Sequence, residues 1–203
     1  MLRKLQERHD LVKSLHPLAW SQPKSRLRRQ TSQPSETEVF RPLEASSWGT
    51  RYFESQSKGF CGRHALNNLL GMPQFSDFDF GTACEMVMAI TDDQRDQHVS
   101  DDGWYSHSVL GKVFDTIDPP IWRMLSSPQE LCSYDALVSN SDVIGSVVNQ
   151  NGRHWTCVVK HESAVWHVDS MSAPAKLSQV EHANLMKQYP MTFAVVLHGK
   201  GMY

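Results

Sequence analysis

The sequence lacks the features that mark secreted or membrane-embedded chains. Its 203 residues include only four cysteines, too few and too scattered for a disulfide-stapled secreted domain. No apolar run approaches the roughly 18 residues that a membrane-spanning helix needs, and the first residues lack the apolar core of a secretory signal. We therefore expect a soluble protein in a reducing compartment, cytoplasmic or nuclear, with no membrane partner.

Net charge is also low, at −2, but it is unevenly distributed. Residues 1–30 carry eight Lys and Arg against two acidic residues, a net charge of +6, and the remaining residues carry −8. A basic arm of this kind is a solvated tail, an organelle or nuclear signal, or a nucleic-acid contact. Aromatic stacking residues are scarce beside these charges, so we expect no nucleic-acid partner, while organelle targeting stays open.

The basic segment is predicted to lie outside the folded domain. Residues 1–15 can make one amphipathic helical stretch, but SQPKSRLRRQTSQPSETEVFRP has too few apolar residues to bury. We therefore expect residues 1–50 to form a disordered or partly helical extension. The folded domain is predicted to span residues 51–203 and to be a monomer.

Hydrophobic periodicity predicts helices in the first part of this domain and strands in the second. The predicted helices are Cys61–Leu70, Phe80–Ile90 and Ser106–Thr116. The predicted strands are Ile121–Leu125, Val143–Asn149, His154–His161, Ala164–Asp169 and Met191–His198. This order is typical of an α+β fold in which N-terminal helices pack on an antiparallel sheet.

Cys61 begins the first predicted helix, in the string FCGRH. Free backbone N–H groups and the positive end of the helix dipole favour a thiolate at such a position. A lone cysteine is nevertheless more often buried and inert than reactive. Other residues must therefore decide whether Cys61 is a nucleophile.

A predicted hairpin brings a histidine and a carboxylate together. A four-residue turn over Lys160–Ser163 would set His154 directly opposite Asp169. A carboxylate beside an imidazole fixes its tautomer and stabilises the imidazolium. The pair is either a general base with its orienting partner or an ordinary polar cross-strand pair.

Gln56 lies in the loop that leads into the first helix. Its side-chain amide could lie beside the thiol of Cys61. That N–H, with the backbone N–H of Cys61, would stabilise the oxyanion that forms when a thiolate attacks a carbonyl. In isolation, a glutamine in a loop is usually a solvated polar residue.

Four strings in register resemble the Josephin family of papain-like cysteine proteases, which cleave ubiquitin from proteins: QSKGFCGRHALNNLLG, DDGWYSHSVL, GRHWTCV and VWHVDS. The resemblance covers roughly residues 51–200. It implies that Cys61 is the nucleophile and His154 the general base. It also implies that Asp169 is the third catalytic residue and Gln56 the oxyanion side chain. The implied partner is ubiquitin or a ubiquitinated protein, and no cofactor is implied.

Other functions stay open beside hydrolysis of the bond after the C-terminal glycine of ubiquitin. One is a papain-like amidase or acyltransferase with a different acyl donor, and another is a non-catalytic ubiquitin-binding module. A zinc site is suggested by Cys61 and His64 with His154 and Cys157, which mimic a four-ligand set. Residues three apart on a strand point to opposite faces, so His154 and Cys157 could not both bind the ion, and we expect no metal.

Two tryptophans are candidates for substrate contact. Trp104 and Trp155 are either core residues or walls of a substrate groove. The resemblance favours the groove for Trp155, because it follows His154. The acidic residues of TDDQRDQHVSDDG are most simply a solvated loop, but they could also attract a basic partner.

Overall fold

The computed structural model describes residues 48–56, 59–126 and 130–197, all within the unit that runs from Arg41 to Tyr203. The expected helical stretch in residues 1–15 and the basic residues lie outside this part. Among the described residues, no helix is long and apolar enough to cross a membrane.

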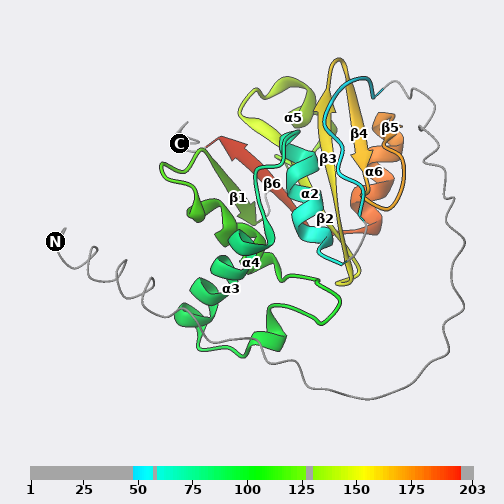
Figure 1. Cartoon of the computed structure of the whole chain (residues 1–203). Helices are drawn as coiled ribbons and strands as arrows, with labels where there is room; N and C mark the ends of the chain where they lie inside the picture. The colour runs from blue at the N-terminus through cyan, green and yellow to red at the C-terminus, as the bar shows by residue number, and fades with distance from the viewer. Residues whose placement is uncertain (1–47, 57–58, 127–129, 198–203) are drawn as a thin grey trace, which may run out of the picture. The chain divides into compact units, whose positions relative to one another are not determined.

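A six-stranded antiparallel sheet lies at the centre of the described part of the chain (Figure 1). Its strands are β1 (Trp122–Ser126), β2 (Val143–Gln150), β3 (His154–His161), β4 (Ala164–Val168), β5 (Ala175–Leu177) and β6 (Thr192–Leu197). They are ordered β1-β6-β2-β3-β4-β5, and each neighbouring pair runs antiparallel. The predicted α+β class and the antiparallel sheet are therefore confirmed.

Helices cover both faces of this sheet. One face packs against α2 (Cys61–Leu70), α3 (Asp77–Thr91) and α4 (His107–Lys112), and the other against α5 (Tyr134–Ser139) and α6 (Gln179–Gln188). Successive side chains of a strand point to opposite faces, so the sheet has one hydrophobic core on each face. Trp155 and Cys157 lie in the first core, beneath α2, α3 and α4, and Val158 lies in the second, beneath α5 and α6. The sequence thus correctly predicts helices on a sheet, but it places helices on one side only.

The bounds of α2 and β3 match the prediction, and other elements differ at their ends. Helix α3 begins three residues earlier than expected because Ser76 caps it: its backbone N–H and its hydroxyl both donate to Asp79 Oδ2, at 2.8 and 2.6 Å. The helix expected over Ser106–Thr116 is α4 followed by a 3-10 turn, η2 (Val113–Thr116). A second such turn, η1 (Arg95–Gln97), lies in the acidic loop.

Three elements have no counterpart in the prediction: α5, β5 and α6. A signal for α6 exists, because Ser178 and Glu181 form a capping box in which the Ser178 backbone N–H donates to Glu181 Oε2 at 2.8 Å. Its apolar stripe is weak, however, and His182 is its one buried residue. Helix α5 is too short, at six residues, for periodicity to reveal it.

Among the described residues, the first one in the packed core is Trp48, three residues before the predicted boundary. The indole is buried and packs edge-on against Trp166, with ring centroids 5.3 Å apart, and against His161, at 5.1 Å. The His161 ring also contacts the Trp48 carbonyl oxygen through Nε2 at 2.9 Å. These contacts tie the start of the domain to the hairpin that carries the candidate base.

Candidate active site

Cys61 is the first residue of α2, as the sequence predicts. The preceding residue, Phe60, has left-handed backbone geometry (φ 70°), and its backbone N–H donates to the Gly103 carbonyl at 3.1 Å. This conformation is costly for a bulky residue and tends to occur where function requires it. The first N–H groups of the helix point out beside the thiol, where they favour a thiolate and a bound anion.

The hairpin register differs from the prediction, yet it still joins the expected pair. His161 pairs with Ala164, so the turn has two residues rather than four, and Asp169 follows the pair Cys157 and Val168. Asp169 is therefore a diagonal neighbour of His154 rather than its direct partner. A shift of two residues keeps both side chains on the same face. Their side chains meet, with 2.9 Å between His154 Nε2 and Asp169 Oδ1.

His154 interacts with both Asp169 and Cys61. The hydrogen bond to Asp169 and then that to Cys61 raise the pKa of His154 to about 9, against a smaller opposing effect of burial. Burial alone would raise the pKa of Asp169, but hydrogen bonds from His154 and from the Met171 backbone N–H, at 2.9 Å, lower it. At neutral pH the histidine is therefore an imidazolium between two acidic partners.

Gln56 is held by a residue that the sequence did not single out. Its backbone N–H donates to the Ser170 carbonyl at 2.7 Å, and the Ser170 hydroxyl donates to Gln56 Oε1 at 3.0 Å. Ser170 is 2% exposed and follows Asp169 directly in the chain. The oxygen of the Gln56 amide is thus occupied, which leaves the Nε2 hydrogens as donors.

A buried polar network, here called the Glu54 clamp, fixes the segment that carries Gln56 against α2. The Glu54 backbone is bound at both ends by Asn68, whose Oδ1 accepts from Glu54 N at 2.5 Å and whose Nδ2 donates to Glu54 O at 3.0 Å. The Glu54 carboxylate lies 2.8 Å from Asn67 Nδ2, 3.1 Å from Arg63 Nη2 and 2.8 Å from His64 Nδ1. Sequence reasoning missed this clamp, although two asparagines inside one helix are a signal of buried polar contacts.

The loop of residues 100–105 contacts the backbone of residues 59–60, just before Cys61. A methyl group at Gly59 would overlap the Asp102 carbonyl, and one at Gly103 would lie 2.6 Å from the Phe60 nitrogen. Gly103 also has a positive φ of 83°, which favours glycine. Because neither glycine has a side chain, the two backbone segments can lie in direct contact.

The two tryptophans expected to contact substrate differ in burial. Trp155 is 0% exposed, and its indole N–H donates to the Tyr105 carbonyl at 2.7 Å. It therefore presents no surface to a substrate, because helices cover the face of β3 to which it points. Trp104 is partly buried and stacks on Trp155, with ring centroids 6.4 Å apart and planes 13° apart. Of the two, Trp104 keeps accessible surface near the site.

A family model for Josephin matches residues 56–197, well over half of the chain. The chain belongs to the Josephin family. The match contains all four residues expected in catalysis, and it confirms the resemblance seen in the sequence. No curated protein matched the chain in a sequence comparison. Josephin domains are, in general, deubiquitinase-like proteins of the cysteine-protease type.

The residues of the zinc alternative have other surroundings in this Josephin domain. Within residues 48–56, 59–126 and 130–197, no three His, Cys, Asp or Glu side chains are placed to hold a metal ion. His64 instead contacts Glu54, and burial lowers its pKa despite that carboxylate. Cys157 is buried in the core, and burial raises its pKa.

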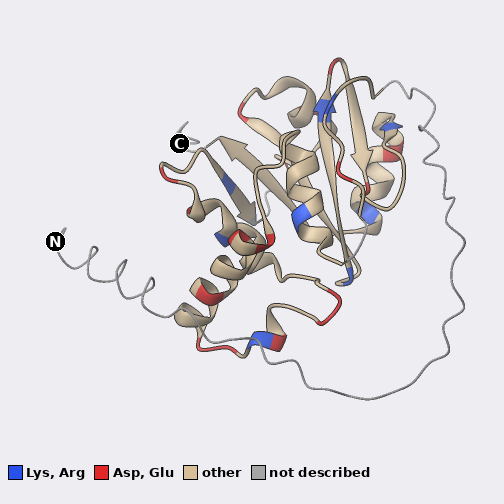
Figure 2. Ribbon diagram, viewed as in Figure 1, with Lys and Arg blue, Asp and Glu red and all other residues tan. Residues whose placement is uncertain are grey.

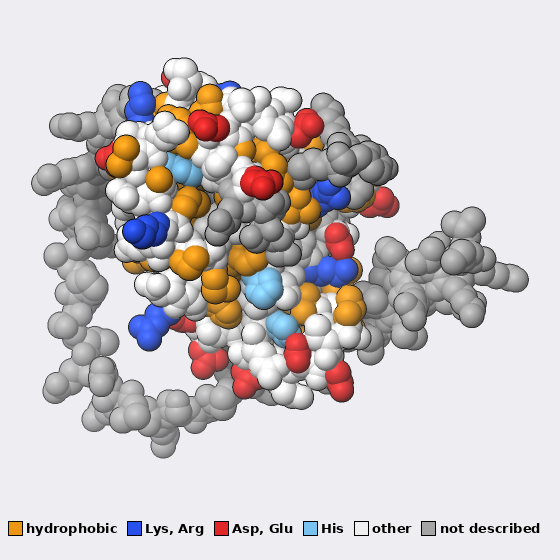
Figure 3. All heavy atoms as spheres, turned by 180° about the vertical axis from the view of Figure 1, so that it is seen from behind, with side chains coloured by type: hydrophobic (Ala, Val, Ile, Leu, Met, Phe, Trp, Pro, Cys, Tyr) orange, Lys and Arg blue, Asp and Glu red, His pale blue; other side chains and the backbone are white. Residues whose placement is uncertain are grey.

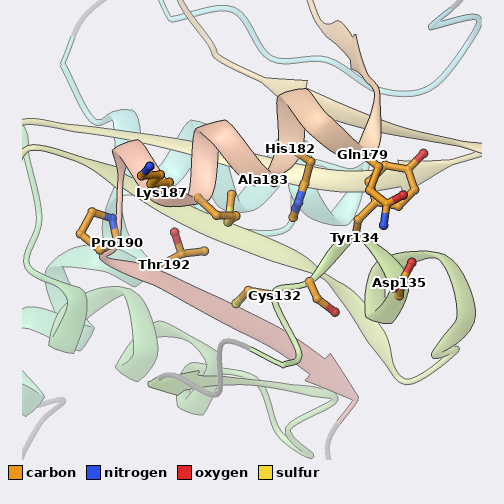
Figure 4. A pocket seen from close by; sticks show the side chains of 11 residues that line it. Cys132, Tyr134, Asp135, Gln179, His182, Ala183, Lys187, Pro190 and Thr192 are labelled. Atoms are coloured by element: carbon orange, nitrogen blue, oxygen red, sulfur yellow. The ribbon is translucent and has the colours of Figure 1, made fainter.

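A cavity of about 430 Å³ lies apart from the Josephin site, between α5, α6 and the start of β6 (Figure 4). Its lining includes Cys132, Tyr134 and His182, on the second core face of the sheet. Within the described part of the chain, His182 Nε2 is buried without a hydrogen-bond partner, and burial lowers the pKa of the ring. None of the four expected catalytic residues lines this cavity.

The surface carries an acidic region near the loop that contacts the Josephin site. Acidic residues lie along α3 and in the loop after it (Figure 2), where Asp92, Asp93, Asp96, Asp101 and Asp102 are exposed. Seen from behind, hydrophobic side chains are interspersed with polar and charged ones (Figure 3).

Proposed function

We propose that this Josephin domain is a cysteine-type deubiquitinase that hydrolyses the peptide or isopeptide bond after the C-terminal glycine of ubiquitin. The observation that carries this proposal is the pairing of Cys61, at a helix N-terminus, with a histidine that Asp169 holds at 2.9 Å. This is the arrangement of nucleophile, base and orienting residue that thiol hydrolases use.

The reaction begins with the thiolate of Cys61 attacking the carbonyl carbon of the substrate. The backbone N–H of Cys61 and the side-chain amide of Gln56 donate to the oxyanion that forms. His154 then gives its proton to the leaving amine nitrogen as the carbon–nitrogen bond breaks, and a thioester remains on Cys61. Water attacks this thioester while His154 takes one of its protons, and collapse of the intermediate breaks the carbon–sulfur bond, releases the acid and restores the thiolate of Cys61 beside the imidazolium.

Two features suit a substrate with the tail Leu-Arg-Leu-Arg-Gly-Gly. Cys61 is 4% exposed, so its thiol lies largely below the surface, a position that suits a substrate end without side chains such as Gly-Gly. Asp101 and Asp102 are exposed on the loop that contacts residues 59–60, where their charge favours the approach of the tail arginines.

The test is a ubiquitin derivative with a C-terminal electrophile, together with a fluorogenic ubiquitin substrate. We expect covalent labelling and turnover by the wild-type protein and background levels of both in Cys61→Ala. Cys132→Ala is a matched control, because its free thiol is similarly buried, at 5% exposed, and lines the distant cavity. It should keep labelling and turnover.

Three outcomes would contradict the proposal. Labelling that persists in Cys61→Ala would remove Cys61 as the nucleophile. Turnover of small amides without any reaction with ubiquitin would favour an amidase or acyltransferase. Binding of ubiquitin without labelling or turnover would favour a non-catalytic binding module.

A further inference from the structure

We propose that Ser170 is a positioning residue that holds the side-chain amide of Gln56 with its NH₂ group directed to the oxyanion. The inference rests on the proposed function only in the role that it gives to Gln56. Ser170 does not touch the reacting atoms in this account; it acts through Gln56.

Two contacts join these residues, one to the backbone and one to the side chain. The 2.7 Å bond from Gln56 N to Ser170 O fixes where the Gln56 backbone lies. The 3.0 Å bond from Ser170 Oγ to Gln56 Oε1 fixes which way the amide faces. Ser55 contributes a weaker contact to the same carbonyl, at 3.4 Å. A segment with no regular secondary structure is thus anchored to Ser170, the second residue after β4.

The side-chain contact matters because an amide has two unlike ends. Its oxygen only accepts hydrogen bonds and its nitrogen only donates them, while the two ends have nearly the same size. An amide turned by half a rotation would present its oxygen to the oxyanion and destabilise it. The Ser170 hydroxyl is buried, so a Gln56 oxygen without this partner would be left under-bonded in a poorly hydrated place.

The position of Ser170 also couples the two halves of the site. Ser170 follows Asp169, whose carboxylate accepts from both His154 and the Met171 backbone N–H. The Asp169 carbonyl accepts from the Ser172 backbone N–H at 3.1 Å, which closes a tight turn. One turn after β4 therefore orients the base through Asp169 and the oxyanion amide through Ser170.

The test compares two reactions of Cys61 that need different parts of the site. Alkylation by iodoacetamide needs the thiolate but forms no oxyanion, whereas acylation by p-nitrophenyl acetate passes through one. Loss of an oxyanion donor lowers rates by about 10²–10³, so we expect Ser170→Ala, which keeps the donor but frees it to turn, to acylate about 10- to 100-fold more slowly. Its alkylation rate should stay within about twofold of wild type.

Matched variants separate positioning from general damage. Ser172→Ala makes the same chemical change at an exposed serine two residues away and should leave both rates unchanged. The double variant Gln56→Ala with Ser170→Ala should acylate no more slowly than Gln56→Ala alone, because Ser170 acts through Gln56. Ser170→Thr keeps the hydroxyl and should restore most of the acylation rate, and it also serves if the alanine variant fails to fold.

The inference is overturned if Ser170→Ala acylates at the wild-type rate, or if acylation and alkylation fall together. Additive losses in the double variant would overturn it as well. Because neither reagent contains ubiquitin, the result is independent of the substrate. A wild-type protein that ignores ubiquitin but shows the expected dependence on Ser170 would contradict the proposed function and support this inference.

Discussion

Two regions of the molecule bring the candidate site together, and they hold their residues by different means. The β3–β4 hairpin places His154 and Asp169 through a backbone ladder that runs from His161 and Ala164 to Cys157 and Val168. Such a ladder bonds backbone to backbone, so it tolerates most side chains. The position of the imidazole therefore depends on few particular side chains besides those of His154 and its orienting partner Asp169.

The segment before α2 has no such ladder. Its position depends on the Glu54 clamp at one end and on Ser170 at the other. These are bonds from particular side chains, several of them buried, and each is lost when its residue changes. Substitutions away from the reacting atoms should therefore disturb the segment before α2, which leads to the nucleophile, more than the β3–β4 hairpin, which carries the base.

The largest losses of activity should come from substitutions of the base His154 and of its orienting partner Asp169. Asp169→Ala should lose about 10- to 1,000-fold in kcat, or about 1.4 to 4 kcal/mol of barrier, because the imidazole loses its orienting partner. His154→Ala should be at least as damaging. Asp169→Asn should keep substantial activity, since its side-chain oxygen still accepts from the ring. Cleavage of the fluorogenic ubiquitin substrate by the three folded variants measures this.

Two results would change that view of the hairpin. An asparagine variant as inactive as the alanine variant would show that the site needs the full charge. Wild-type rates in both Asp169 variants would place Asp169 outside the mechanism.

The clamp should give the next largest effect, although it touches no substrate. Glu54→Gln leaves His64 without its carboxylate and removes one of the two carboxylates that Arg63 contacts, the other being Asp77. An unpaired buried group such as His64 costs about 1–3 kcal/mol in the free energy of unfolding. We expect kcat to fall about tenfold as the lead into α2 loosens, which corresponds to about 1.4 kcal/mol of barrier. Urea unfolding and turnover are the two measurements.

Glu85→Gln is the matched control for the clamp. It breaks the ion pair with Arg95, whose 2.7 Å separation is as short but whose partners are exposed. Exposed pairs contribute about 0–1 kcal/mol, so this variant should be close to wild type in stability and turnover. Equal losses in the two variants would refute the contrast between the two regions.

The pH dependence of kcat/KM should reflect both regions, because His154 of the hairpin interacts with Asp169 and with Cys61 of α2. The pKa of His154 is raised to about 9, so the imidazolium is present at neutral pH and is lost as pH rises through that value. We expect activity to fall on the alkaline side near pH 9. In Asp169→Asn the largest cause of the raised pKa is weakened, so this fall should move to lower pH. An unchanged alkaline limb would show that another group controls it.

Removal of residues 1–43 should have the smallest effect. Trp48 is the first core residue in the part of the chain that the structure describes, and every expected catalytic residue follows it. A chain that starts at Glu44 should turn over the fluorogenic substrate within a few fold of the full-length protein. A loss of a hundredfold, or about 2.7 kcal/mol of barrier, would show that the removed residues complete the site.

The sequence predicts the hairpin better than it predicts the clamp, for physical reasons. Period-two patterning identifies strands, and a turn length wrong by two residues still keeps His154 and Asp169 on one face. The turn itself was misjudged because Glu162 adopts a left-handed conformation, φ 54°, which is uncommon for that residue.

Contacts between distant parts of the chain were beyond sequence patterns. Ser170 meets Gln56 across 114 residues, and no local periodicity encodes that bond. Trp155 was expected in a groove, but its burial depends on how helices from elsewhere in the chain cover β3. Residues with a recognisable chemistry or motif could therefore be named from the sequence, and residues that hold them through long-range contacts could not.

Gly59 and Gly103 restrict how this domain can be redesigned. Each glycine faces backbone of the opposite segment, so the loop of residues 100–105 and the lead into Cys61 behave as one inseparable part. A loop grafted there to change substrate preference must keep a glycine where Gly103 stands, or it will displace the residues that lead into the nucleophile.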